Sequence, residues 1–257
     1  MASTFPFLAG PVPYGFAHQG GGLEHPENSW PAFRHAVEDL GYGYLETDVV
    51  ASSDGVVFHM HDTSLDRTTT LSGPAKDRPW SEIASCTVKG TNEPPPRLED
   101  VLTRWPTLRV NLEPKSDEAV EPMIALIRRL DAVDRICVGS FNGARINRLR
   151  KALGSGLCSS TGPAATVRLV AGSYLPIIVG KLIANTKAGC YQVPIKQYGI
   201  PVTTRRTIAL AHAMGKQMHI WTIDEAPEMT RLFDLGIDAI MTDRPSVLSE
   251  VLAGRAH

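Results

Sequence analysis

Residues 14–50 of the chain read YGFAHQGGGLEHPENSWPAFRHAVEDLGYGYLETDVV. Two short apolar runs, Tyr14–His18 and Tyr44–Val50, flank the segment Ser29–Leu40, whose apolar residues recur with helical spacing. Gly41 follows that segment, at a position where glycine commonly ends a helix. Short β-rich runs of this kind are typical of parallel strands that are buried on both faces. The stretch therefore predicts a strand, a helix and a second strand.

The same alternation continues along nearly the whole chain. Further strands are predicted at Leu108–Glu113, Ile136–Gly139, Gly156–Ser159, Gly189–Val193, Gln217–Ile223 and Ala239–Met241. Helical patterns lie at Glu118–Leu130, Ala144–Leu153, Thr204–Met214, Pro227–Leu235 and Ser246–Leu252. Eight strands with intervening helices predict a (β/α)8 TIM barrel, with a doubly wound sheet as the alternative.

One region, residues 52–96, interrupts this alternation. It is rich in turn residues, such as those at 53–55, 72–74 and 94–96, and it lacks a long helical pattern. We therefore expect a small insertion after the second strand, followed by a short helix around Glu99–Leu102. Because α/β barrels commonly reach this length as one domain, we expect a single domain over residues 1–257.

Composition limits the partners and the compartment. Lys and Arg number 26 against 27 Asp and Glu, and no basic tail is present, so nucleic acid is not expected as a partner. The four cysteines show no CxxC spacing and are expected to be small buried side chains in a reducing compartment. Residues 1–13 lack the charged start of a secretory signal, which favours a cytoplasmic protein.

The most hydrophobic stretch, Val167–Ala184, contains Arg168, Pro176 and Lys181, so it is not expected to span a membrane. It is nevertheless more apolar than an exposed barrel helix requires. A peripheral contact with an acyl chain or a lipid surface is one interpretation. A helix packed against the barrel, or an interface between subunits, is the interpretation that we favour.

Three carboxylates are expected at one end of the barrel. Glu46 and Asp48 are two residues apart on a predicted strand, so their side chains share a face. Glu113 ends the next predicted barrel strand, and neighbouring strands lie about 4.8 Å apart. Such a cluster needs a cation to neutralise it, and ligation by oxygen alone favours Mg²⁺ or Ca²⁺. A surface charge or a helix cap is the alternative for Glu113.

Two histidines follow the same strands. His18 ends the first strand and His61 lies beyond the second, and imidazoles can act as general acid and base in phosphodiester cleavage near pH 7. The sequence does not assign these two roles between them. Lys115 could supply positive charge to a phosphate oxygen. The other histidines are expected to be structural, with His59 the first exception because it shares a face with His61; they are His25, His35, His59, His212, His219 and His257.

These residues resemble the glycerophosphodiester phosphodiesterase family. The resemblance rests on an ordered set of short motifs from the first predicted strand to the last. They are His18-Gln19-Gly20, Pro26-Glu27-Asn28-Ser29, Ala32-Phe33, Glu46-x-Asp48, Asp54-Gly55, His61-Asp62, Leu65, Arg67-Thr68-Thr69, Glu113-x-Lys115, Ser140-Phe141, Trp221-Thr222, Gly236-Ile237-Asp238 and Thr242-Asp243-Arg244-Pro245.

The resemblance implies a TIM barrel with an insertion after the second strand and hydrolysis of glycerophosphodiesters to sn-glycerol 3-phosphate and an alcohol. It implies metal ligands at Glu46, Asp48 and Glu113, with an acid/base pair at His18 and His61. It also implies Glu27, a further candidate ligand, and Asn28 near the site, and Trp221 in the substrate pocket or the barrel core. Asp62 and Arg67 are expected mainly to orient the insertion and His61.

One position departs from the family pattern. The residue after His18 is usually an arginine that contacts phosphate, and here it is Gln19. A neutral amide cannot replace a bidentate cation, so we expect weaker stabilisation of transition-state charge.

Two alternative functions remain open at this stage. A lysophospholipase D would apply the same chemistry to monoacyl lipids and could use the apolar stretch. A non-catalytic barrel that binds phosphodiesters would have lost activity at Gln19, although both histidines and all the inferred ligands are present.

Overall fold

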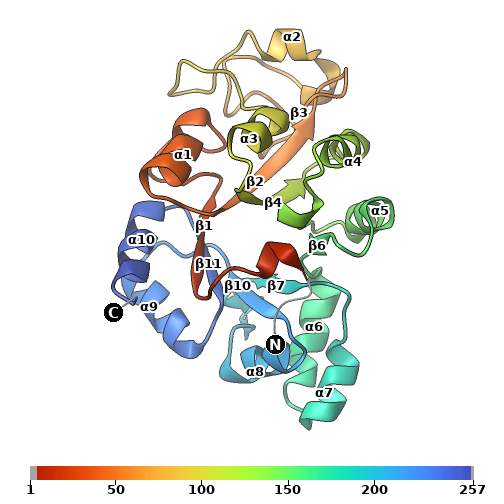
Figure 1. Cartoon of the computed structure of the whole chain (residues 1–257), viewed down its shortest axis with the longest axis vertical. Coiled ribbons are helices and arrows are strands. Elements are labelled where there is room, and N and C mark those ends of the chain that lie inside the picture. Colours follow the sequence, from red (N-terminus) through yellow and green to blue (C-terminus); the bar gives the residue numbers. More distant parts are fainter. Residues whose placement is uncertain (1–4, 256–257) are drawn as a thin grey trace.

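Eight parallel strands form a barrel in the computed structural model, which describes residues 5–255 (Figure 1). Residues 1–4, part of the N-terminal stretch considered above, and residues 256–257, with His257, lie outside the described part. The barrel strands are β1 Tyr14–His18, β2 Tyr44–Ala51, β4 Arg109–Pro114, β5 Ile136–Val138, β6 Cys158–Ser159, β7 Cys190–Val193, β10 Gln217–Ile220 and β11 Ala239–Thr242. Each falls within one residue of a predicted strand except β6, which begins two residues later, and β10, which ends three residues earlier.

The sheet closes on itself. Its order is β6-β5-β4-β2-β1-β11-β10-β7, with neighbouring strands parallel. A parallel bridge between Ser160 and Cys190 joins the two ends of this order. There, the Gly189 amide donates to the Ser159 carbonyl at 2.9 Å and the Thr161 amide donates to the Cys190 carbonyl at 3.1 Å. The predicted (β/α)8 barrel is confirmed, and the doubly wound alternative is wrong because an open sheet has no such closure.

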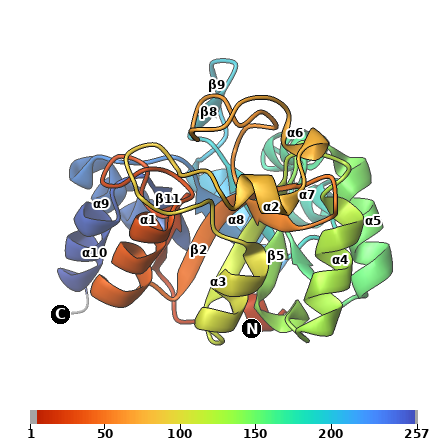
Figure 2. The same cartoon turned by 90° about the horizontal axis from the view of Figure 1, so that it is seen from above.

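Helices surround the barrel (Figures 1 and 2). The predicted ones are α1 Trp30–Arg34, continued by the π-helical η2 His35–Asp39, α3 Leu98–Arg104, α4 Val120–Arg129, α5 Gly143–Leu153, α8 Arg205–Ala213, α9 Ala226–Leu235 and α10 Pro245–Ala253. Side-chain caps stabilise the starts of α1 and α8: Ser29 Oγ accepts from the Ala32 amide, and Thr204 and Thr207 form a reciprocal capping box.

The apolar stretch Val167–Ala184 forms parts of two helices, α6 Pro163–Gly172 and α7 Ile177–Ala184, which are separated near Pro176. Proline ends the preceding helix because it cannot donate a backbone hydrogen bond. A short hairpin, β8 Lys196–Gln197 and β9 Ile200–Pro201, follows β7. Within residues 5–255, no helix is long and apolar enough to cross a membrane.

The insertion after β2 contains β3 Val57–His59, η3 Ala75–Asp77 and α2 Trp80–Ile83. Strand β3 pairs antiparallel with β2, and the insertion has its own small apolar cluster around Phe58, Leu65 and Ile83. In Figure 2 the insertion and the β8–β9 hairpin project from the same end of the barrel, opposite the chain termini. Since the insertion directly follows β2, this end carries the carboxyl ends of the strands.

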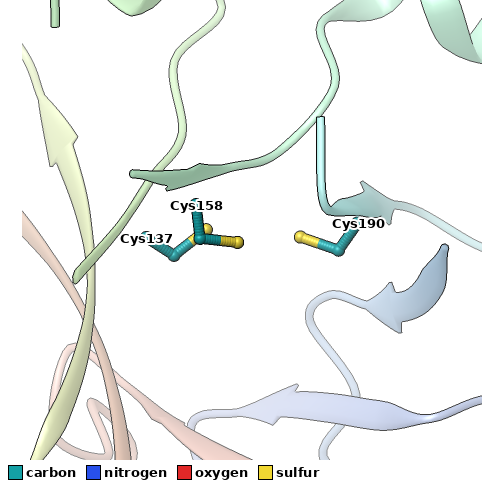
Figure 3. Close-up of side chains that lie close together, drawn as sticks. All are labelled: Cys137, Cys158 and Cys190. Carbon is teal, nitrogen blue, oxygen red and sulfur yellow. The ribbon is translucent and has the colours of Figure 1, made fainter. Parts of the chain in front are cut away.

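The opposite end of the barrel interior is closed by aromatic and sulfur-containing side chains. The N-terminal turn η1, Pro6–Leu8, packs Phe7 and Leu8 against Phe16 and the neighbouring thiols. Figure 3 shows Cys137, Cys158 and Cys190 facing one another from β5, β6 and β7, with their sulfur atoms within 4.8 Å of one another. All four cysteines are free and buried, which confirms that they act as small buried side chains.

Candidate active site

A cavity of about 720 Å³ lies at the carboxyl ends of the strands, where barrel enzymes place their active sites. The structure brings all eight residues singled out from the sequence to its wall. They are His18, Gln19, Glu46, Asp48, His61, Glu113, Lys115 and Trp221. His18 and Trp221, 203 positions apart in the sequence, therefore meet because the barrel closes.

The carboxylates occupy neighbouring strands at matching heights. Asp48 of β2 lies opposite Glu113 of β4, and Glu46 lies one side-chain repeat before Asp48 on the same strand. Glu46 Oε2 is buried and has no hydrogen-bond partner in the described part of the chain. Burial, reinforced by the charges of Asp48 and Glu113, raises the pKa of Glu46 to about 8.

A positive group already lies between two of these acids. Lys115 Nζ is 3.1 Å from Asp48 Oδ1 and 3.4 Å from Glu113 Oε2. Burial lowers the pKa of Lys115, but the charges of Asp48 and Glu113 outweigh that effect and raise it. Glu46 Oε2, which accepts no hydrogen bond from the described residues, and the all-oxygen set of three acids fit a hard divalent cation.

Gln19 takes part in this cluster through Asp48. Its side-chain amide Nε2 donates to Asp48 Oδ2 at 2.6 Å, and its backbone is left-handed, with φ of 52°. The turn then passes through Gly20, where a Cβ atom would lie 2.7 Å from the Ala32 side chain of α1. The tight packing of this turn against α1 points the Gln19 side chain inward, where it holds the carboxylate without adding charge.

His18 is held by a carboxylate from the other end of the sequence. Its Nδ1 lies 2.7 Å from Asp243 Oδ1, and its Nε2 lies 3.6 Å from Glu46 Oε2. Burial alone would lower the pKa of His18, but Glu46 and Asp243 outweigh it and raise the pKa to about 9. The contact with Asp243 fixes the ring so that Nε2 faces the carboxylate cluster.

His61 is held in a similar way by its neighbour. Its Nδ1 lies 2.7 Å from Asp62 Oδ1. Arg67 donates to Asp62 through Nε at 2.7 Å and to both Glu27 oxygens at 2.7 Å. These hydrogen bonds from Arg67 and His61 hold the pKa of Asp62 well below its usual range. Arg67 therefore links Asp62, the partner of His61, to Glu27, the further candidate ligand.

Four of the remaining histidines make structural contacts. His59 Nδ1 lies 2.8 Å from Thr47 Oγ1, and burial lowers the pKa of His59 to about 3, so its ring is neutral. It packs behind β2 and outside the main cavity. His212 contacts Asp238, His35 contacts Glu24, and His219 contacts Tyr14.

Two features of the site had no role assigned from sequence. Asp243 was noted only within a motif, although it follows β11 directly and so belongs to the set of strand-end acids. The second feature is a chain of polar side chains inside the barrel: Gln192 donates to Asn111 at 3.1 Å, its Nε2 lies 3.5 Å from His219 Nδ1, and His219 Nε2 lies 3.1 Å from the Tyr14 hydroxyl.

The opposite wall of the cavity is apolar. It is formed by Val167, Val170 and Tyr174 of α6 and the segment after it, and by Tyr198 and Ile200 of the β8–β9 hairpin. Trp221 lies between the two walls: it lines the cavity, packs on the interior aromatic cluster and meets Phe141 edge-on at 6.3 Å. The cavity therefore has a charged half and an apolar half.

Comparison with known proteins identifies the family of the chain. The family model described as the glycerophosphoryl diester phosphodiesterase family matches residues 18–247. The chain belongs to the glycerophosphoryl diester phosphodiesterase family. Membership confirms the resemblance found in the sequence and the expectation of an enzyme, a phosphoric diester hydrolase.

Individual members of the family cover nearly the whole chain. A Mycobacterium tuberculosis protein named "Probable glycerophosphodiester phosphodiesterase 2" is 35% identical over 257 residues, covering 100% of this chain and 97% of the relative. A lysophospholipase D of Rattus norvegicus is 23% identical, covering 92% of this chain and 85% of its own length. The structure of an Oleispira antarctica phosphodiesterase with its product sn-glycerol-3-phosphate matches with a TM-score of 0.74 at 19% identity, covering 96% of this chain and 98% of the other.

Proposed function

We propose that this chain hydrolyses glycerophosphodiesters to sn-glycerol 3-phosphate and an alcohol, in one domain that carries the whole site. The observation that carries the proposal is the meeting of two carboxylate-anchored histidines, His18 and His61, with three acids at one end of a single cavity. Phosphodiester cleavage needs a proton acceptor, a proton donor and charge neutralisation at phosphorus. This cavity offers residue types for all three.

The three acids would hold a divalent cation, Mg²⁺ or Ca²⁺. Glu46 is the strongest candidate because its Oε2 is buried without a hydrogen-bond partner among residues 5–255, and Asp48 and Glu113 face it from the same rim. When bound, the cation supplies Lewis-acid polarisation of a phosphoryl oxygen. Lys115 then adds fixed positive charge beside the phosphate, and Gln19 keeps Asp48 oriented through its 2.6 Å hydrogen bond.

The two histidines would move the protons. Asp243 and Asp62 engage the Nδ1 atoms of His18 and His61, which leaves each Nε2 for the reacting groups. One imidazole accepts a proton from the attacking oxygen, which is water or the glycerol 2-hydroxyl of the substrate. In the second case a cyclic phosphate forms, and water then opens it, breaking the bond to the 2-oxygen, which takes a proton back. The other imidazole donates a proton to the departing alkoxide. Since both rings are anchored alike, we assign the two roles to the pair jointly.

A substrate panel tests the proposal. Purified protein is assayed for glycerol 3-phosphate release from glycerophosphocholine and glycerophosphoethanolamine, with Mg²⁺, with Ca²⁺ and with chelator. We expect turnover that the chelator abolishes and that one of the cations restores. No turnover with any diester, combined with intact cation binding, would favour a binding protein disabled at Gln19.

The apolar wall favours a second candidate, lysophospholipase D activity. Val167, Tyr174 and Tyr198 offer an acyl chain a surface that a glycerophosphodiester with a small headgroup does not need. Adding a lysophospholipid to the same panel separates the two candidates. A higher kcat/KM for the lysolipid than for glycerophosphocholine would make lysolipids the preferred substrate class. The opposite order would show that the apolar wall does not serve to bind an acyl chain.

A further inference from the structure

The near-neutral net charge conceals a strong segregation along the chain. Residues 135–223 contain twelve Lys or Arg and no Asp or Glu. The other 168 residues hold the remaining 14 basic side chains and all 27 carboxylates. This segment runs from η4, Val133–Arg135, through β5 to the end of β10, so one side of the barrel is strongly basic and the other is acidic. Charge asymmetry of this size indicates an anionic partner.

The basic segment also carries the most exposed apolar helix of the described chain. Helix α7 buries only Gly180 and Ala184 and leaves five large apolar side chains accessible. Ile178 and Leu182 are 73% and 75% exposed. The helix is turned outward because α6 and α7 cross at Gly172 and Gly180, where a Cβ atom on Gly180 would lie 2.6 Å from the Gly172 carbonyl oxygen. A side chain at either glycine would push the helices apart.

This outward face is continuous with the mouth of the active-site cavity. Tyr174, which connects α6 to α7, both lines the cavity and is exposed to solvent, and so do Tyr198 and Ile200 of the hairpin. In Figure 1, α7 lies at the edge of the molecule beside α6. The apolar surface thus extends from the cavity to the outside of the protein. A continuous apolar surface of this kind is expected where a protein takes an apolar substrate from a lipid surface.

Basic side chains surround this face without carboxylate partners. Arg168 of α6, Lys181 of α7, Lys187 of the segment before β7 and Lys196 of the hairpin are exposed. None of these four side chains forms an ion pair with any residue from 5 to 255. Arg206 stacks on the Tyr174 ring, with its guanidinium carbon 5.1 Å from the ring centre. Cations at the margin of an apolar face are the arrangement that binds anionic headgroups while apolar side chains enter the lipid.

We propose that α7, the α6–α7 connection and the β8–β9 hairpin form a docking surface for a membrane that carries anionic lipids. This inference rests on the proposed function. A membrane bound at this surface would lie at the mouth of the cavity. A second copy of the chain is disfavoured as the occupant, because a symmetric interface would bring the same uncompensated cations against one another. A lipid surface supplies both apolar and anionic contacts.

Vesicle co-sedimentation tests the surface with the full chain. Phosphatidylcholine vesicles are compared with vesicles containing three parts in ten of phosphatidylglycerol. We expect at least tenfold stronger partitioning to the anionic vesicles, since each basic side chain near such a surface contributes roughly fivefold. Salt at 0.5 M, about three times the physiological level, should remove most of this preference through screening.

Two variants separate the apolar and the basic contributions. I178S with L182S removes exposed apolar contacts without changing charge and should lower partitioning at least tenfold. K181Q with K196Q should lower it more at low salt than at high salt. The matched control, K76Q with K89Q, removes the same charge from the insertion and should leave partitioning unchanged.

Hydrolysis of glycerophosphocholine without vesicles distinguishes failure of this surface from failure of the proposed function. All three double variants should retain wild-type turnover there, because none touches the charged half of the cavity. If the wild-type protein binds the vesicles but does not hydrolyse glycerophosphocholine, the proposed function is wrong and the docking surface stands. Equal binding to both vesicle types, or a dimer that I178S/L182S dissociates without any vesicle binding, would overturn the lipid surface.

Discussion

The two sides of this barrel differ in how they carry function. The side formed by β1, β2, β4 and β11 holds His18, Glu46, Asp48, Glu113 and Asp243 in a network of hydrogen bonds and ion pairs. The side formed by α6, α7 and the hairpin has no carboxylate and exposes apolar and basic side chains. In the proposed function, the first side acts on the phosphate and the second side binds the group that is attached to the phosphate.

Removal of either histidine should have the largest effect on the charged side. H18A or H61A should lower turnover of glycerophosphocholine by about 10³-fold, since general acid–base catalysis contributes roughly 10²–10⁴-fold per group. Circular dichroism should show an unchanged fold. H212A, which removes a histidine on α8 outside the cavity, serves as the control and should retain activity. Retention of a tenth of wild-type activity by both site variants would contradict the proposed roles.

A smaller loss is expected at Gln19, which acts through Asp48. Q19A removes the 2.6 Å hydrogen bond to Asp48 Oδ2 and should raise the cation concentration needed for half-maximal activity by about 10–100-fold, as for other groups that orient a ligand. Activity at saturating cation should fall less. Measurement of turnover against Mg²⁺ and Ca²⁺ concentration checks this, and an unchanged cation dependence would show that Asp48 does not need Gln19.

Substitutions on the apolar side should change the kinetics of a lipid substrate and leave those of a small diester unchanged. Y174S with Y198S should raise KM for a lysophospholipid about tenfold and leave kcat/KM for glycerophosphocholine within twofold, since each ring removes apolar contact only from a long substrate. Steady-state kinetics with both substrates checks the difference. Equal losses on both would mean that the apolar wall shapes the whole cavity and does not select lipid.

The sequence predicted the charged side far better than the apolar side. Glu46, Asp48 and Glu113 lie on strands whose period and position fix both their face and their end of the barrel, so their clustering followed from strand geometry. The contact between His18 and Asp243 required the pairing of the first strand with the last, which local patterns do not specify. The inward position of Gln19 required a left-handed turn packed against α1.

The apolar side had weaker sequence signals. The stretch Val167–Ala184 was recognised as unusually apolar, but its outward orientation depends on the close crossing of Gly172 and Gly180. The interpretation favoured from the sequence was packing against the barrel or an interface between subunits. Leu169 and Ala184 are buried, whereas Ile178 and Leu182 are exposed. Each strand of the β8–β9 hairpin has only two residues, so no alternation of apolar and polar residues could predict it.

The smallest expected effect concerns stability on α8, away from both halves of the cavity. The hydrogen bond to Asp238 raises the pKa of His212 above its unfolded value near 6.5. The stabilisation is therefore fully present below pH 6.5 and is lost as pH rises through the folded pKa. Because the pair is partly exposed, we expect H212A to lower the free energy of unfolding by less than about 1 kcal/mol at pH 5.5. The decrease at pH 9 should be smaller than the decrease at pH 5.5. Urea unfolding at both pH values measures this, and an equal loss at both would rule out the charged contact.

The central claim is tested most directly by cation-dependent turnover of wild type and E46Q. Glycerol 3-phosphate release from glycerophosphocholine is followed before chelation, after chelation and after return of Mg²⁺ or Ca²⁺. The account predicts that chelation abolishes release, that one of these cations restores it in wild type, and that E46Q retains at most about a hundredth of wild-type activity. Full activity in chelator, or wild-type turnover by E46Q, would contradict a cation held by these carboxylates.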